Sequence, residues 1–233
     1  MHFLCIVKQI TMGTLPLYVS LTLVLVTALT GWLFYKASGY SKAVLIILLA
    51  WLFIQAVVAL TGFYQNTSVL PPRFLFAIGP PLLLIVLLFL TRRGRRFIQS
   101  LNLATLTLLH IIRVPVEIVL FWIFLHKGIP EVMTFEGRNL DIISGLTAPV
   151  IYYLGFVNRK LSPGTILAWN LVCLALLVNI VTTAILSTPY PFQKFGFDQP
   201  NVAIFYFPFV WLPAMIVPVV LLSHLAGIRK LIV

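Results

Sequence analysis

Residues 107–121 read TLLHIIRVPVEIVLF, and this stretch decides the class of the fold. It lies within a longer apolar run, residues 101–126, whose only Lys, Arg, Asp or Glu side chains are Arg113 and Glu117. About 20 mostly apolar residues cross a bilayer core of ~30 Å as an α-helix. The run therefore predicts a membrane-spanning helix that has a small polar group inside it.

The whole chain has the composition of a membrane protein. Of its 233 residues, 61% are hydrophobic and 9% are charged, and the mean hydropathy is +1.08. Soluble domains carry roughly 25% charged residues. A net charge of +11 would suggest nucleic acid binding in a soluble protein, but here the basic residues gather at the ends of apolar runs. We therefore expect contact with membrane lipids and no nucleic acid partner.

Six further runs are long and apolar enough to resemble the first one. The chain is predicted to be all-α, a polytopic membrane helix bundle that forms one integral membrane domain over residues 1–233. Compact connectors such as TRRGRR join the helices, and the first run is expected to stay as a membrane anchor rather than to be cleaved. The seven predicted transmembrane helices cover about 14–35, 43–63, 73–91, 101–126, 140–157, 164–187 and 203–226.

The basic residues also predict an orientation. With seven spans, one side of the membrane collects twice as many Lys and Arg residues as the other, and the richer side is cytoplasmic by the positive-inside rule. The N-terminus is then outside and the C-terminus cytoplasmic, and we expect the plasma (inner) membrane of a bacterium. The richer side holds Lys36, Lys42, Arg92, Arg93, Arg95, Arg96, Arg159, Lys160, Arg229 and Lys230, and the other side holds Lys8, Arg73, Lys127, Arg138 and Lys194.

The fourth predicted span carries a polar stripe. Asn102, His110, Arg113 and Glu117 fall within an arc of roughly 80° on an ideal helix. Because a charge facing lipid is costly, the stripe should face the interior of the bundle. Arg113 and Glu117 are four residues apart and are expected to pair along the helix. Pro115 predicts a bend in this span.

The outer loop and the fifth span supply the other candidate site residues. The segment after the fourth span holds Glu136, Arg138 and Asp141, an unusual density for a chain with five acids. Asn139 or Asp141 is suited to cap the next helix. One face of the fifth span combines Tyr152 with small residues, which predicts close packing against the fourth span.

The remaining titratable residues do not predict a metal or cofactor. His126 and His224 are expected near opposite membrane ends, away from the depth of His110, which argues against a haem or metal site. The sequence contains no Walker motif, GxGxxG or CxxC. We therefore predict no metal, no cofactor and no phosphate chemistry of the soluble type.

The polar residues favour one function and leave two others open. A guanidinium binds carboxylate or phosphate, and Glu and His can exchange protons. We therefore expect the protein to bind or transport a small anionic or acidic metabolite, with or without proton coupling. The predicted ligand-binding or proton-relay residues are His110, Arg113, Glu117, Glu136, Arg138, Asp141 and Tyr152. One alternative is an intramembrane enzyme acting on a lipid-like substrate, with His110 or Glu117 as acid/base and Arg113 holding a headgroup. The other is a structural or sensory subunit. The sequence leaves the catalytic residues and the oligomeric state undetermined.

Overall fold

A computed structural model describes residues 15–232. This part of the chain folds into helices and contains no β-strand, which confirms the all-α prediction. The first predicted span starts at residue 14, which lies outside the described residues together with Cys5 and Lys8. The first half of the bundle comprises α2 (Leu17–Ala37), α3 (Lys42–Leu60), the 3-10 turn η2 (Phe63–Gln65), α4 (Leu75–Leu90) and α5 (Arg92–Ser100).

The second half begins with a helix in three parts. Helix α6 passes through a 3-10 turn, η3, into α7, so the fourth predicted span is locally tightened in a turn that ends three residues before Pro115. Asn102 is not part of the helical stripe, because its side chain caps α6 by accepting from Thr105 N at 2.8 Å. The elements are α6 (Leu103–Leu109), η3 (His110–Ile112), α7 (Arg113–Leu125), η4 (Glu131–Met133), α8 (Ile142–Tyr152), the π-helical η5 (Tyr153–Val157), α9 (Pro163–Leu186), η6 (Ala203–Phe205), the π-helical η7 (Leu212–Ile216) and α10 (Val217–Ile232).

Every one of the seven predicted ranges contains a helix, but not every helix has spanning length. Five helices of the described chain are long and apolar enough to cross a membrane: α2, α3, α6 to α7, α9, and η7 to α10. A sixth is reached if α4 and α5, which are bent by 95° at their junction, count as one span. The helix from Ile142 to Val157 is apolar but shorter. At 1.5 Å per residue it extends about 24 Å, less than the ~30 Å of a bilayer core.

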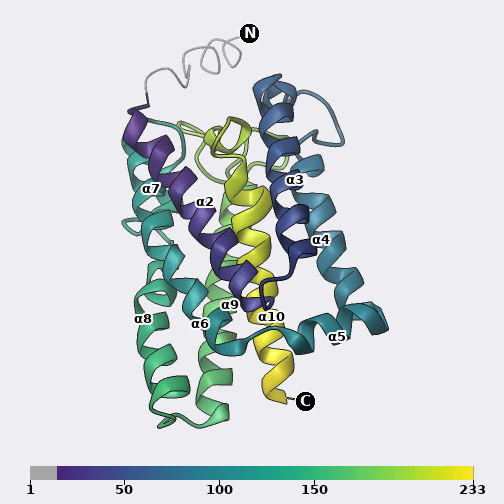
Figure 1. The fold of residues 1–233 in the computed structure, drawn as a ribbon. Coiled ribbons are helices and arrows are strands. Elements are labelled where there is room, and N and C mark those ends of the chain that lie inside the picture. Colours follow the sequence, from purple (N-terminus) through teal and green to yellow (C-terminus); the bar gives the residue numbers. More distant parts are fainter. Residues whose placement is uncertain (1–14, 233) are drawn as a thin grey trace.

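One predicted connector is wrong. The arginines of TRRGRR are not in a compact loop but in the helix α5, which Figure 1 shows turning away from the end of α4. Thr91 caps this helix, since its hydroxyl accepts from Gly94 N at 3.1 Å. Gly94 also lies so close to α4 that a Cβ there would be 2.4 Å from Leu88 Cα. The cap and this close contact together explain the sharp corner.

Helix α10 is central to the bundle. It contacts α9, α6 and α4, and α2 packs against α6 and α7. Figure 1 shows α2 beginning at one end of the bundle and α10 finishing at the opposite end. The buried charged side chains Arg113, Glu117 and Asp141 lie where α7, the start of α8, α9 and α10 meet, and this position defines the candidate site.

Candidate functional site: a buried polar network

The three polar residues of the fourth span are all buried. His110, Arg113 and Glu117 are 1%, 2% and 1% exposed. They come from η3 and the first turns of α7, and they face the other helices of the bundle. Burial among neighbouring helices removes these polar groups from lipid, which could not satisfy them.

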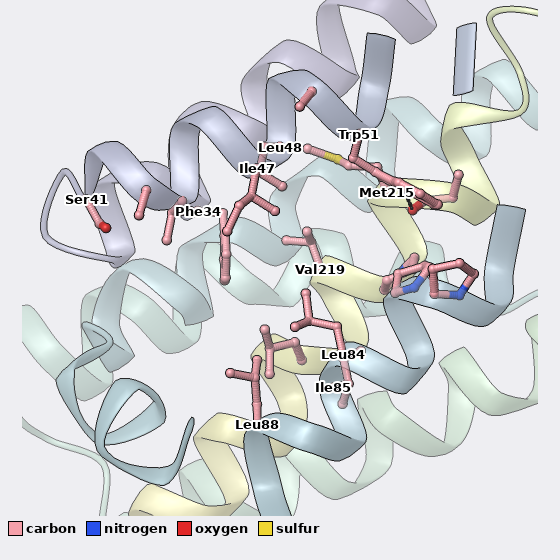
Figure 2. Close-up of a pocket in the computed structure, with 18 of the residues that line it drawn as sticks. Phe34, Ser41, Ile47, Leu48, Trp51, Leu84, Ile85, Leu88, Met215 and Val219 are labelled. Atoms are coloured by element: carbon pink, nitrogen blue, oxygen red, sulfur yellow. Dashed lines mark hydrogen bonds between the residues drawn. The ribbon is translucent and has the colours of Figure 1, made fainter. Parts of the chain in front are cut away.

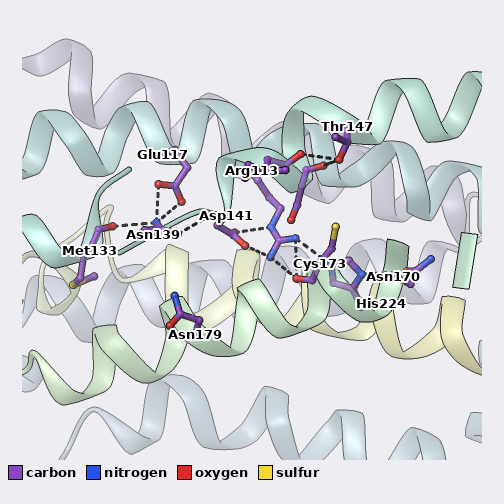
Figure 3. Close-up of polar contacts among 12 residues, drawn as sticks. Arg113, Glu117, Met133, Asn139, Asp141, Thr147, Asn170, Cys173, Asn179 and His224 are labelled. Atoms are coloured by element: carbon purple, nitrogen blue, oxygen red, sulfur yellow. Dashed lines mark hydrogen bonds and ion pairs between the residues drawn. The ribbon is translucent and has the colours of Figure 1, made fainter. Parts of the chain in front are cut away.

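Arg113 pairs with Asp141, the residue immediately before α8. Its Nε donates to Asp141 Oδ2 at 2.6 Å, and its Nη2 lies against Asp141 Oδ1 as an ion pair. The predicted pair between Arg113 and Glu117 is therefore wrong. An Arg that precedes its acid on a helix is in the weaker orientation, whereas Asp141 approaches from another helix and meets the guanidinium along its side (Figure 3).

The rest of the guanidinium contacts α9 and α10. Nη1 and Nη2 both donate to the carbonyl of Cys173 at 3.4 Å, and Nη1 lies 3.1 Å from His224 Nε2. Because arginine can only donate, His224 must accept through Nε2 and carry its proton on Nδ1. That proton then points at Asn170 Oδ1, 3.1 Å away. The contacts thus define the tautomer of His224.

His110 stacks on His224. The ring centroids are 3.8 Å apart with 17° between the planes, and Trp169 meets His110 edge-on at 5.6 Å. The prediction that His224 lies at a membrane end, away from His110, is wrong. Helix α10 continues to Ile232, so His224 lies about two turns inside its helix. Within the described residues no group of three or more His, Cys, Asp or Glu side chains is arranged to hold a metal ion.

Glu117 belongs to the same network through Asn139. The Asn139 amide nitrogen donates to Glu117 Oε1 at 2.6 Å, to Oε2 at 2.7 Å and to the Met133 carbonyl at 3.0 Å. Its oxygen accepts from the backbone N–H of Asp141 at 3.0 Å. One amide therefore links the carboxylate of Glu117 to the residue that pairs with Arg113 (Figure 3).

Close packing of α8 brings these groups together. A Cβ on Gly145 would lie 2.8 Å from both Val114 N and Val114 Cγ2, and 3.3 Å from Arg113 Cβ. Ser144 and Ala148, on the same face, are completely buried. The small-residue face of the fifth predicted span thus packs against the fourth as expected. Because of this approach, Asp141 lies within reach of Arg113.

The contacts form one continuous path. It runs from Glu117 through Asn139, Asp141 and Arg113 to His224, and it ends at Asn170, whose amide donates to the Ile166 carbonyl at 3.0 Å. Three helices, α7, α9 and α10, and the segment before α8 contribute to it. At one end the path begins in the loop that connects α7 to α8. At the other end it reaches Asn170, in the third turn of α9, which starts at the opposite end of the bundle.

Residues 70–232 match a family model described as Domain of unknown function (DUF8737). The chain belongs to this family. The match includes every residue of the polar path, from Arg113 to His224. No curated protein and no solved structure matches the chain.

Three predicted site residues lie apart from the polar path in this DUF8737 chain. Glu136 and Arg138 are exposed, and the Arg138 guanidinium lies 5.6 Å above the ring of Phe195. Tyr152 is half-buried, and its ring contacts Phe156. The structure does not bring these three together with Arg113.

Sequence reasoning missed four members of the path: Asn139, Asn170, Cys173 and His224. Asn170 and His224 were visible as polar side chains inside apolar runs; His224 contacts both Arg113 and Asn170 through its two ring nitrogens. Cys173 takes part only through its backbone carbonyl. No property of its side chain could have shown this role.

Proposed function

We propose that this DUF8737 protein binds or transports a small anion such as a carboxylate, coupled to protons, in the plasma membrane of a bacterium. The single observation that supports it is the internal ion pair of Arg113 with Asp141. Asp141 is a carboxylate that occupies the position where the carboxylate of a ligand would bind. A guanidinium offers the same planar pair of donors to either one.

Proton coupling follows if the carboxylate of the ligand replaces the carboxylate of Asp141 on Arg113. Protonation of Asp141 removes the negative charge that holds Arg113, and an incoming anion then restores neutrality at the guanidinium. Asn139 of the outer loop donates to Glu117 and accepts from the backbone N–H of Asp141, so Glu117 is the acid we assign to proton exchange on that side. Because an uncompensated buried ion is costly, the anion has to bind Arg113 as Asp141 takes up its proton, and this requirement couples the two events.

The proposed topology has seven spans, with the N-terminus outside and the C-terminus cytoplasmic. It includes the short α8 as a full span and treats α5 as a helix at the cytoplasmic surface. The twofold excess of Lys and Arg on that side supports the orientation. With this orientation Glu117 lies toward the outside and Asn170 toward the cytoplasm.

Uptake into vesicles tests the proposal. The full chain would be reconstituted in phosphatidylcholine vesicles with an imposed pH gradient, and radiolabelled acetate, succinate and inorganic phosphate would be offered. We expect at least one of these anions to accumulate with the gradient, and Arg113→Met/Asp141→Leu to abolish this while remaining folded. Arg138→Gln, which removes an exposed arginine outside the path, should retain uptake. Undiminished uptake by the folded double variant would contradict the proposal.

A structural role is the second candidate, and one observation favours it. Arg113 Nε, Nη1 and Nη2 all have partners within the protein. A fully satisfied ion pair can hold three helices together without any ligand. In that case none of the three anions accumulates in vesicles of the wild-type chain, and the network acts only on stability.

A further inference from the structure

A second feature of the molecule lies apart from the polar path. A cavity of about 550 Å³ runs between α3, α4 and α10, as Figure 2 shows. Its walls are apolar side chains such as Leu48, Leu84 and Val219. It extends along α3 from Ser41 to Ile54, about 20 Å at 1.5 Å per residue. That length exceeds the ~15 Å depth of one leaflet of a ~30 Å hydrocarbon core.

The Ser41 end of this groove adjoins a strongly basic helix. Phe97 of α5 lines the groove, and Arg93 lies one turn before it on the same helix. Three arginines and Gln99 surround a recess of about 380 Å³ on α5. These arginines are Arg92, Arg95 and Arg96.

Within residues 15–232 no acidic side chain forms an ion pair with these arginines. The only acids of the sequence are at positions 117, 131, 136, 141 and 198, all of them outside α3, α4, α5 and α10. Arg95 is held in place, since its Nη1 donates to the Leu90 carbonyl at 3.0 Å. Arg92, Arg93 and Arg96 are exposed. The groove thus combines an apolar channel of acyl-chain length with an uncompensated positive charge at its end.

We infer that this groove binds an anionic phospholipid. One acyl chain lies along the groove between α3 and the pair α4 and α10, and the phosphate of the headgroup lies among the exposed arginines of α5. An α-helix with its side chains is about 10 Å or more wide, so a volume of about 550 Å³ suits an acyl chain better than a partner helix. The charge selects the headgroup, because each Lys or Arg near the surface attracts anionic lipid. The inference does not depend on the proposed transport function.

Spin-labelled lipids test this inference on the full chain in phosphatidylcholine vesicles. Electron paramagnetic resonance measures how much labelled phosphatidylglycerol or labelled phosphatidylcholine is immobilised by the protein. We expect phosphatidylglycerol to be preferred about threefold or more, with the preference falling as ionic strength rises. Arg93→Gln/Arg96→Gln should bring the ratio close to one. The matched control Arg159→Gln/Lys160→Gln, which removes two exposed charges from a loop at the same end of the bundle, should keep it.

A second pair of variants tests the groove itself. Ile47 lines the cavity, whereas Ile46 is exposed on α3 outside it. Ile47→Trp should reduce the immobilised phosphatidylglycerol, and Ile46→Trp should leave it unchanged. Equal immobilisation of the two lipids by the wild-type chain would overturn the inference. An equal loss of lipid preference in Arg93→Gln/Arg96→Gln and in the control Arg159→Gln/Lys160→Gln would also overturn it. So would a change of oligomeric state in Ile47→Trp that leaves the lipid preference intact.

Discussion

Arg113 pairs with Asp141, 28 residues further along the chain, and not with Glu117 on the next turn of its own helix. The pair joins the start of α7 to the residue before α8, and both side chains are buried. Two charges that are buried together tolerate joint removal much better than the loss of one partner. The identity of the partner can therefore be tested by stability alone.

Removing either member of the pair should destabilise the protein strongly. Asp141→Leu and Arg113→Met each leave one buried charge uncompensated and should cost about 3–5 kcal/mol, whereas the double variant Arg113→Met/Asp141→Leu should recover most of that loss. Thermal unfolding in detergent measures the three variants. Arg113→Met/Glu117→Leu is the matched control, and it should show no recovery because Asp141 remains unpaired. Recovery in the control instead of in the first double variant would show that the helix-internal pair is the real one.

Asn139 should be as important as the charged residues. Asn139→Leu leaves the buried Glu117 carboxylate and the Met133 carbonyl without their donor, at a cost of about 1–3 kcal/mol for each orphaned group. Asn179→Leu removes an exposed amide that donates to the Arg138 carbonyl at 3.0 Å, and should cost about 0.5 kcal/mol or less. Denaturation in detergent compares the two. Similar losses for both would show that Asn139 does not satisfy Glu117.

The close approach of α8 predicts an asymmetry between two glycines. Gly145→Ala forces a methyl group to within 2.8 Å of the Val114 backbone, which has to move, and should cost about 1–3 kcal/mol. Gly79, inside α4, has no atom within 4 Å of its Cβ position. Gly79→Ala should therefore be neutral or gain about 0.5–1 kcal/mol from helix propensity. Unfolding temperatures that fall equally in both variants would contradict the packing at Gly145.

The membrane class and the approximate helix ranges were predictable, because hydropathy over about 20 residues is a property of the sequence alone. The helix α5 was not. Its four arginines have the composition of an exposed connector, whereas in the structure Thr91 caps a helix here and Gly94 packs closely against Leu88. Both depend on how the chain turns after α4.

The burial of Arg113 was predictable in the same way, since lipid offers no partner to a guanidinium. Its partners were not, because periodicity relates only residues three or four positions apart on one helix. Asp141 and His224 reach Arg113 from other helices, and the separation along the chain to His224 is 111 residues. The predicted helix ends were the other source of error. The seventh span was predicted to end at residue 226, but α10 continues to Ile232, so His224 lies inside the helix and stacks on His110.

Cysteine labelling tests the topology, including whether the short α8 crosses the membrane. Arg96, Glu136 and Lys160 are exposed, and each would be replaced by Cys in a Cys5→Ser/Cys173→Ala background. A membrane-impermeant maleimide should label Glu136→Cys in intact cells, and should label Arg96→Cys and Lys160→Cys only after permeabilisation, because the positive-inside rule places both basic segments in the cytoplasm. Gly94 and Thr134 are buried and would be poor label positions. If Glu136→Cys and Lys160→Cys are labelled from the same side, α8 does not span the membrane. If Glu136→Cys and Arg96→Cys are labelled from the same side, the predicted crossing by α6 and α7 is wrong.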